Sequence, residues 1–400
     1  MKNAYIISAC RTPFGKYGGA LKDVRPDDMA GLVIAEAVKR AGINTNEIDD
    51  VIMGCANQAG EDNRNVARMG VLLAGLPERT PATTINRLCG SSLDAIIQAS
   101  RAIMTGEANI IVAGGVESMT RAPYSLPKNV SGSALFGNLT AYDTALGWRY
   151  PNPNLEKMFP LEVMGETGEN VAEQWHVSRE DQDAFALESH RRAIDAQERG
   201  AYDEEIVHVP IPQKKGTPII IAKDEQPRPD TSLEKLAKLF PAFRKGGSVT
   251  AGNSSSLNDG ASAVVVASEE VVKKLGIEPL GRYVASGVEG ISPRIMGVGP
   301  IYAVQKILNR TELTIDDIDL IELNEAFASQ SLAVIRHFKL SMDKVNVNGG
   351  AIAIGHPLGA SGGRLVATLL YEMRRRKVKR GIATMCIGVG QGIAAMFEAV

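Results

Sequence analysis

The order of strand-like and helix-like segments near the start of the chain recurs near its end, and this internal repeat constrains the fold more than any other feature. In each half a helix leads through acidic residues into a strand, at 33–54 and at 303–324. A glycine-containing turn, a helix, a strand and a second glycine loop follow, at 89–115 and at 359–390. A repeated unit of this kind predicts two similar domains whose equivalent loops meet at a shared cleft.

Within the first half, apolar residues alternate between strand spacing and helix spacing. The predicted strands are 4–10, 50–54 and 109–113, and the predicted helices are 26–42, 63–74 and 91–105. Gly42 is a natural end for the first of these helices. Alternating strands and helices are typical of an α/β fold with a mostly parallel sheet and helices on both faces. We therefore expect two similar βαβαβ-type halves.

The alternation breaks between residues 122 and 249, where the chain becomes rich in aromatic residues and proline. This stretch includes a charged, helix-like run at 178–200 and an extended run at 207–221. An insertion after the strand ends of an α/β sheet usually covers the ligand crevice, although a solvated excursion is the alternative. The predicted domains are 1–121 with 250–275, an inserted loop domain at 122–249 and a second half at 276–400.

Composition excludes several classes of function. The formal net charge of −2 argues against nucleic acid as the main partner, although a local basic patch could still bind an anion. No apolar run approaches the ~20 residues needed to span a bilayer, so no membrane association is expected. The four cysteines lie far apart, with no CxxC and no metal-ligand spacing. We expect reduced thiols in a cytoplasmic protein, and no metal site.

Cys89 is the first candidate for chemistry, because it directly precedes the predicted helix at 91–105. A thiol at a helix N-terminus faces the positive end of the helix dipole, which favours the thiolate. Gly90 would let another group approach closely. The alternative is a small buried core residue, the commoner place for a lone cysteine.

His356 lies between Gly355 and Pro357, in a stiff loop before a predicted helix at 364–373. A fixed orientation suits a general base, and the other four histidines lie in polar or helical surroundings without such a setting. The alternative for His356 is a residue that only hydrogen-bonds within its loop.

Cys386 and Asn324 also stand at predicted strand ends. Cys386 precedes a Gly388-Val389-Gly390 turn whose backbone N–H groups could bind an anion, which is a weak signal alone. Asn324 could polarise a carbonyl or hold a water, or it could simply cap the next helix. If the two halves meet at their loops, one site collects both thiols, His356 and Asn324. Two thiols without a metal suit acyl transfer to one and proton transfer by the other.

At these positions the sequence resembles the thiolase family, nearly end to end. The matching blocks are RTPFG at 11–15, NRLCGSS at 86–92, GGVESM at 114–119, VTAGNSS at 249–255, NEAF at 324–327, GHPLG at 355–359 and MCIG at 385–388. The resemblance implies that Cys89 forms the acyl-enzyme, that His356 activates it, and that Cys386 is the acid/base at the substrate α-carbon. It also implies one oxyanion hole from His356 with a water on Asn324, and a second from the N–H groups of Cys89 and Gly388.

The resemblance further implies a five-layer α-β-α-β-α arrangement with coenzyme A, a substrate and not a cofactor, lying against the loop domain. Ser255 matches a contact to the pantetheine and Arg228 a basic residue near the nucleotide. Met164, Ala251 and Phe327 are further expected CoA contacts. Members of the family are usually homotetramers, dimers of dimers, so acyl-CoA, CoA and further copies of the chain are the expected partners.

The loop domain also bears on the acyl chain. Val163 precedes Met164-Gly165 where acetoacetyl-CoA-specific thiolases commonly carry a histidine. The sequence at 142–149 is more similar to that of thiolases that act on 3-oxoadipyl-CoA. There Arg149, beside the aromatic ring of Trp148, could face a terminal carboxylate, or it could be an ordinary surface arginine. We take 3-oxoadipyl-CoA as the leading substrate, with medium-chain 3-oxoacyl-CoA and acetoacetyl-CoA as alternatives.

Three other functions compete with thiolase. A decarboxylating condensing enzyme of the ketoacyl synthase type would pair one cysteine with two histidines or with histidine and asparagine, and Cys386 argues against it. A thiolase-fold protein that binds CoA or lipid without turnover would be expected to have lost Cys89, His356 or Cys386. Redox sensing by Cys89 and Cys386 could coexist with catalysis, because two facing thiols can oxidise.

Overall fold

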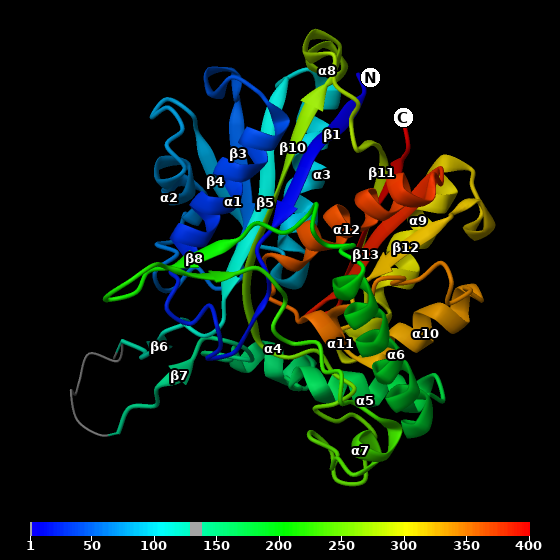
Figure 1. Ribbon diagram of the computed structural model, residues 1–400. Coiled ribbons are helices and arrows are strands. Elements are labelled where there is room, and N and C mark those ends of the chain that lie inside the picture. Colours follow the sequence, from blue (N-terminus) through cyan, green and yellow to red (C-terminus); the bar gives the residue numbers. More distant parts are fainter. Residues whose placement is uncertain (1, 129–137) are drawn as a thin grey trace.

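The computed structural model describes residues 2–128 and 138–400, so 129–137 of the predicted loop domain lie outside the described residues. The first half lies on the left and at the centre of Figure 1, in blue to cyan for its N-terminal elements and in yellow-green for residues 258–275. Its elements are β1 (Ala4–Arg11), β2 (Gly15–Lys16), α1 (Pro26–Ala41), β3 (Asp50–Gly54), α2 (Val66–Leu73), β4 (Ala82–Ile85), α3 (Ser91–Thr105), β5 (Ile110–Ser118), β10 (Asn258–Ser268) and α8 (Glu269–Leu275). Gly42 ends α1 in the left-handed conformation, as predicted, with φ 63°.

The second half lies on the right of Figure 1, in yellow to red. It contains β11 (Gly281–Gly290), α9 (Gly299–Thr311), β12 (Leu320–Leu323), α10 (Ala328–Phe338), α11 (Ala351–Ile354), α12 (Ser361–Arg376), β13 (Arg380–Ile387) and β14 (Gln391–Glu398). The strands run in the order β12-β13-β14-β11-β1-β10-β5-β3-β4. Only Tyr5 and Ile6 of β1 pair with β11, so a short ladder joins two sheets, one from each half.

The expectation of a mostly parallel sheet is wrong. β3 runs parallel to β4 and β5, and β12 runs parallel to β13, but the other pairs are antiparallel. The cause is visible at β13 and β14, which the tight turn through Gly388 and Gly390 connects directly. Parallel neighbours need a crossover connection, so a turn this short forces an antiparallel pair.

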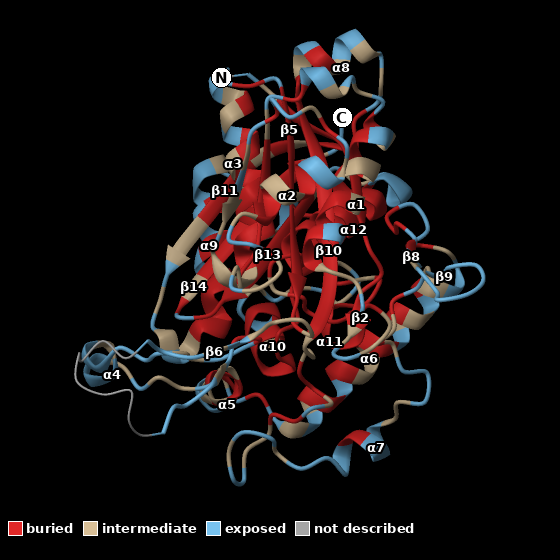
Figure 2. Ribbon diagram, turned by 90° about the vertical axis from the view of Figure 1, so that its left-hand side faces the viewer, coloured by how far each residue is buried: buried red, intermediate tan, exposed pale blue. Residues whose placement is uncertain are grey.

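Helices cover and separate the two sheets in five layers, which confirms the expected arrangement. α1 and α2 pack on the outer face of the first sheet, and α9 packs on the outer face of the second. α3 and α12 lie between the sheets and contact each other. Their central position explains why Leu93, Ile96, Leu365 and Leu369 belong to one core shared by both halves. Both helices are buried over most of their length (Figure 2).

Most of the inserted segment lies below the two halves in Figure 1, in teal to green, whereas residues 207–221 lie against the first half. It contains β6 (Tyr124–Ser125), β7 (Tyr142–Asp143), α4 (Pro153–Met158), α5 (Met164–Gln174), α6 (Arg179–Glu198), β8 (Val209–Ile211), β9 (Ile219–Ile221) and α7 (Leu233–Ala237). α5 and α6 pack on α10, and α6 also packs on α11. The division at 121/122, 249/250 and 275/276 remains our proposal. Within the described ranges, no helix combines the length and apolar character needed to cross a membrane.

Candidate active site

Cys89 lies in a short turn, Leu88–Gly90, between β4 and α3. The residue as a whole is half-buried, and burial of its thiol raises the pKa to about 11. The backbone N–H groups of Gly388 and of Cys89 itself face the sulfur and lower this pKa, but by less. The expected thiolate is therefore wrong for the protein alone, because loss of hydration outweighs the helix dipole. Cys89 needs a base.

The second thiol, Cys386, is buried near the end of β13. Burial raises its pKa, and the charge that Cys89 carries as a thiolate raises it further, which puts the two sulfurs in one electrostatic environment. All four cysteines are free thiols.

The residues beside the two N–H donors are strained. Leu88 precedes Cys89 with φ 47°, and Val389 follows Gly388 with φ 64°. Non-glycine residues rarely adopt a positive φ, and such strain concentrates at functional sites. Here it aims the N–H groups of Cys89 and Gly388 at the Cys89 sulfur.

His356 is buried, and its two ring nitrogens have different surroundings. Nδ1 lies 2.6 Å from Ser361 Oγ, whose hydroxyl donates to Pro357 O at 2.9 Å. Because the Ser361 hydroxyl proton is used in the bond to Pro357 O, His356 Nδ1 donates to Ser361 Oγ, and Nε2 keeps its lone pair. Burial and the positive charge of Arg364 lower the pKa of His356 to about 3, so the ring is a neutral base near pH 7.

Asn324 follows β12 and links the histidine to the Cys386 strand. Its side-chain Nδ2 lies 3.4 Å from His356 Nε2, and its backbone N–H donates to Thr384 O at 3.0 Å. Its buried Oδ1 has no hydrogen-bond partner in the described part of the chain. The alternative of an ordinary N-cap is wrong, because α10 begins at Ala328, with Phe327 as its cap.

Close backbone packing brings the segments that follow Cys89 and His356 close to their neighbours. A Cβ on Gly362, at the start of α12, would lie 2.4 Å from Leu93 N in α3. A Cβ on Gly115 would lie 2.0 Å from Gly359 O, so Gly114-Gly115 is not the loop that the sequence predicted. It lies inside β5, where the missing side chain admits the histidine loop.

The residues expected to bind CoA fall into two groups. Met164 and Phe327 pack with Cys386, and the backbone N–H of Ser255 donates to Ala326 O at 2.9 Å. Arg228 and Ala251 instead line a separate hollow of about 140 Å³. The segment 251–255 connects the two places.

His190, which no sequence pattern singled out, also lines this hollow. His190 Nδ1 accepts a hydrogen bond from Arg228 N at 3.2 Å. Burial, with the nearby Arg228 charge, lowers the pKa of His190 to about 4.

Arg149 is half-buried and touches only neutral oxygens. Its guanidinium lies 3.3 Å from Asn57 Oδ1 and 3.4 Å from Asn57 O, and it has no carboxylate partner within 2–128 and 138–400. The expected stacking on Trp148 is wrong: the described cations that lie over rings are Arg11 and Arg374. The Trp148 indole instead donates to Glu162 O, which turns it toward the 162–164 segment.

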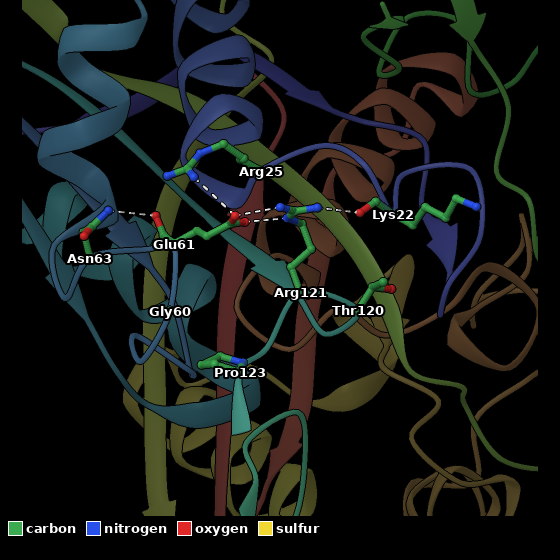
Figure 3. A pocket seen from close by; sticks show the side chains of 8 residues that line it. All are labelled: Lys22, Arg25, Gly60, Glu61, Asn63, Thr120, Arg121 and Pro123. Carbon is green, nitrogen blue, oxygen red and sulfur yellow. Dashed lines mark hydrogen bonds and ion pairs between the residues drawn. The ribbon is translucent and has the colours of Figure 1, made fainter. Parts of the chain in front are cut away.

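Another hollow, of about 520 Å³, is lined by none of these residues (Figure 3). The guanidinium groups of Arg25 and Arg121 both point to Glu61 there, so neither is free to hold an anion. Among the residues that the structure describes, no group of His, Cys, Asp and Glu side chains could hold a metal ion.

Known proteins match the chain over its whole length. The model "Thiolase, N-terminal domain" matches residues 4–270, and "Thiolase, C-terminal domain" matches 277–399. A "Beta-ketoadipyl-CoA thiolase" of Acinetobacter baylyi is 54% identical over 404 residues, and a "3-oxoadipyl-CoA/3-oxo-5,6-dehydrosuberyl-CoA thiolase" of Escherichia coli K12 is 51% identical over 403 residues. Each alignment covers 100% of both chains.

Solved structures agree with these sequence relatives. The Bacillus anthracis acetyl-CoA acetyltransferase superimposes with a TM-score of 0.94 at 43% identity, covering 100% of this chain and 99% of that one. The human mitochondrial 3-ketoacyl-CoA thiolase in complex with CoA gives 0.92 at 40% identity, covering 100% and 98%. With both domain models and full-length relatives in agreement, the chain belongs to the thiolase family of acyltransferases.

Proposed function

We propose that this thiolase cleaves 3-oxoadipyl-CoA with free CoA, giving acetyl-CoA and an acyl-CoA shortened by two carbons. Cys89 attacks the 3-oxo carbon, and the bond between C2 and C3 breaks to leave an acyl group on Cys89. The thiol of CoA then attacks this acyl group and frees Cys89. The observation that carries the proposal is that Cys89 and Cys386 are electrostatic neighbours, with the N–H of Gly388 directed at Cys89.

The proton transfers follow from the protonation states. His356 Nε2, a neutral base, takes the proton of Cys89 as the thiol attacks. This proton later restores the Cys386 thiol, which has given its own proton to the leaving group, and His356 then takes the proton of CoA and passes it to the departing Cys89 thiolate. The N–H groups of Cys89 and Gly388 stabilise the oxyanion formed on the acyl carbon. Cys386 protonates the α-carbon of the departing acetyl-CoA. A water that donates a hydrogen bond to Asn324 Oδ1 stabilises the enolate oxygen together with His356. The lack of a hydrogen-bond partner for Oδ1 among the described residues supports this role.

CoA is proposed to lie along the 251–255 segment, between two groups of residues. Arg228 and Ala251, in the hollow with His190, suit the nucleotide end. Ser255, Met164 and Phe327 lie toward Cys386 and suit the pantetheine end. A non-catalytic binding protein is the weaker alternative, because both thiols, His356 and Asn324 are all present.

The acyl chain is the finer part of the proposal. Full-length relatives named for 3-oxoadipyl-CoA or beta-ketoadipyl-CoA are 50–54% identical to this chain. Arg149, without a carboxylate partner among the described residues, offers a charge for the distal carboxylate of such a substrate. The contact from Asn86 Nδ2 to Ala56 O ties the Asn57 segment under Arg149 to the Cys89 loop. The alternative is a plain 3-oxoacyl-CoA or acetoacetyl-CoA thiolase.

Comparing kcat/KM for acetoacetyl-, 3-oxohexanoyl-, 3-oxooctanoyl- and 3-oxoadipyl-CoA tests this choice. The wild-type protein should prefer 3-oxoadipyl-CoA. Arg149→Met should raise the activation free energy for this substrate by about 2 kcal/mol, which lowers kcat/KM roughly 30-fold. This value is the lower end of the range for a lost charge partner, because Arg149 is half exposed. 3-Oxohexanoyl-CoA has no distal charge and should be nearly unaffected.

Lys157→Met is the matched control, since Lys157 is an exposed cation of the same loop domain, on α4. It should change neither substrate. An equal loss on both substrates in Arg149→Met would indicate a distorted loop domain. No loss on either would assign Arg149 to solvent and favour the plain thiolase.

We also propose a homotetramer, a dimer of dimers, in the cytoplasm. β4 ends the strand order, and its Thr83 is exposed while Ala82, Thr84 and Ile85 are half-buried. An open edge of β-branched residues is a surface that proteins normally cover, and a second copy of the chain would do so.

A further inference from the structure

Glu117 is a buried carboxylate in β5 that accepts hydrogen bonds from three backbone N–H groups and from the Cys55 thiol. It is 2% exposed and forms no ion pair among residues 2–128 and 138–400. Oε2 accepts hydrogen bonds from Ala56 N and Gly359 N, both at 2.9 Å, and Oε1 accepts one from Asn57 N at 3.1 Å. A buried charge without a cation is costly, so an arrangement that keeps it needs an explanation.

The N–H groups that donate to Glu117 come from both halves of the molecule. The chain segments that carry them border the active site. Residues 54–57 contact the Cys89 loop at two places. A Cβ on Gly54 would lie 2.4 Å from Ser91 C, two residues after Cys89, and Ala56 O accepts from Asn86 Nδ2 at 2.9 Å.

The third N–H group belongs to the histidine loop, since Gly359 is three residues after His356. A Cβ on Gly359 would lie 2.6 Å from Val116 O and 2.9 Å from Gly54 O. Glycines thus let the segments at 54–57, 115–117 and 359 touch. Close packing sets how near the backbones approach, but charge-assisted hydrogen bonds fix their orientation.

We propose that Glu117 is a positioning residue of the thiolase reaction, whose carboxylate holds the Cys89 loop and the His356 loop in register across the junction of the two halves. The inference rests on the proposed roles of Cys89 and His356. Glu117 touches no reacting atom in this account. It acts through Ala56 and Asn57 on one side and Gly359 on the other.

The charge of Glu117 has a separate effect of opposite sign. Burial raises the pKa of Glu117 to about 7, the three N–H groups lower it, and Asp62 raises it further. Cys55, whose Sγ lies 3.8 Å from Oε1, is a further titratable neighbour, and the Glu117 charge also raises the pKa of Cys89. Removing only this charge would therefore make Cys89 more reactive, whereas removing the positioning would make it less reactive.

Glu117→Gln separates the two effects, because the amide keeps the size but must turn its NH2 toward a backbone N–H. We expect kcat to fall by about 10²-fold, the scale of a 1 Å misplacement, with KM for the acyl-CoA within about threefold. Alkylation of Cys89 by iodoacetamide at pH 7.5, mapped by mass spectrometry, should slow. The fall in wild-type kcat below about pH 7 should disappear, because protonation of Glu117 causes it and the pKa of His356 is only about 3.

Two further variants make the test decisive. Asp49→Asn is the matched control: this exposed carboxylate accepts from Asn109 N and Ile110 N at the other end of β5, and its loss should leave kcat and alkylation unchanged. Glu117→Asp keeps the charge but withdraws the oxygens by one methylene. If the Gln variant does not fold, Glu117→Asp should still show reduced kcat with the wild-type pH dependence.

Faster alkylation in Glu117→Gln, or wild-type kcat in Glu117→Asp, would overturn the inference. Its failure is distinguishable from failure of the proposed function. If acetyl-CoA still labels wild-type Cys89 while the Glu117 variants keep full kcat, only the positioning role is lost. If Cys89 is not labelled in the wild-type protein, the proposed function fails first.

Discussion

Replacing Cys386 with serine should slow the carbon–carbon step by about 10²–10⁴-fold, the range ascribed to general acid–base catalysis. A hydroxyl is a far weaker acid than a thiol, so it cannot protonate the departing enolate or remove the α-proton in reverse. Acetyl transfer from acetyl-CoA to Cys89 breaks only a thioester and should survive. Serine is close to cysteine in size and shape, so it fits the space that Cys386 occupies beside Val249 and Met296.

The two steps can be measured separately. Intact-mass spectrometry follows acetylation, and loss of the 3-oxoacyl-CoA absorbance follows cleavage. Cys10→Ser is the control, because Cys10 is a buried thiol remote from the site that donates to Val33 O. It should leave both steps intact. An equal fall of both steps in Cys386→Ser would show that Cys386 is structural or serves the nucleophile.

His356→Ala should reduce acylation of Cys89 by a similar 10²–10⁴-fold, because the thiol loses its base. Without His356, reactivity should follow the thiolate alone. Since the pKa of Cys89 is raised to about 11, the logarithm of the alkylation rate should rise by about one per pH unit between pH 7 and 10. In the wild-type protein, His356 has a lowered pKa of about 3 and stays neutral over this range, so the slope should be shallower.

The control for this experiment is His337→Ala, which removes an exposed imidazole from α10. Its alkylation profile should match the wild-type profile. A His356→Ala variant with the wild-type slope would contradict the assignment of His356 as the base.

Local sequence patterns predicted a helix or strand well where the spacing of apolar residues within that one element is enough to identify it. The predicted helix at 91–105 is α3, and the predicted strand at 50–54 is β3. The internal repeat predicted two similar halves, and the resemblance to the thiolase family implied the five layers. Strand direction could not be predicted in the same way, because it depends on whether a tight turn or a crossover follows. The β13–β14 hairpin is an error of this kind. Gly114-Gly115 is a different error, because a glycine pair inside a buried strand was taken for a loop.

The candidate site divides along the same line. Cys89 and His356 were identifiable because each stands beside glycine or proline, and Cys386 and Asn324 because each stands at a predicted strand end. Glu117 and Ser361 were not, because their roles are contacts made in the folded chain. Glu117 bonds Gly359 across 242 positions of sequence. The prediction of a Cys89 thiolate was wrong for a related reason: the helix dipole can be inferred from the sequence, whereas the burial of the thiol cannot.

The central claim is that Cys89 carries the acyl group, and one measurement tests it most directly. The intact protein is exposed briefly to acetyl-CoA, quenched with acid, weighed and then mapped by peptide mass spectrometry. One acetyl group per chain, located on Cys89, is the predicted result. An acetyl group on Cys386, or no covalent adduct at all, would contradict the account.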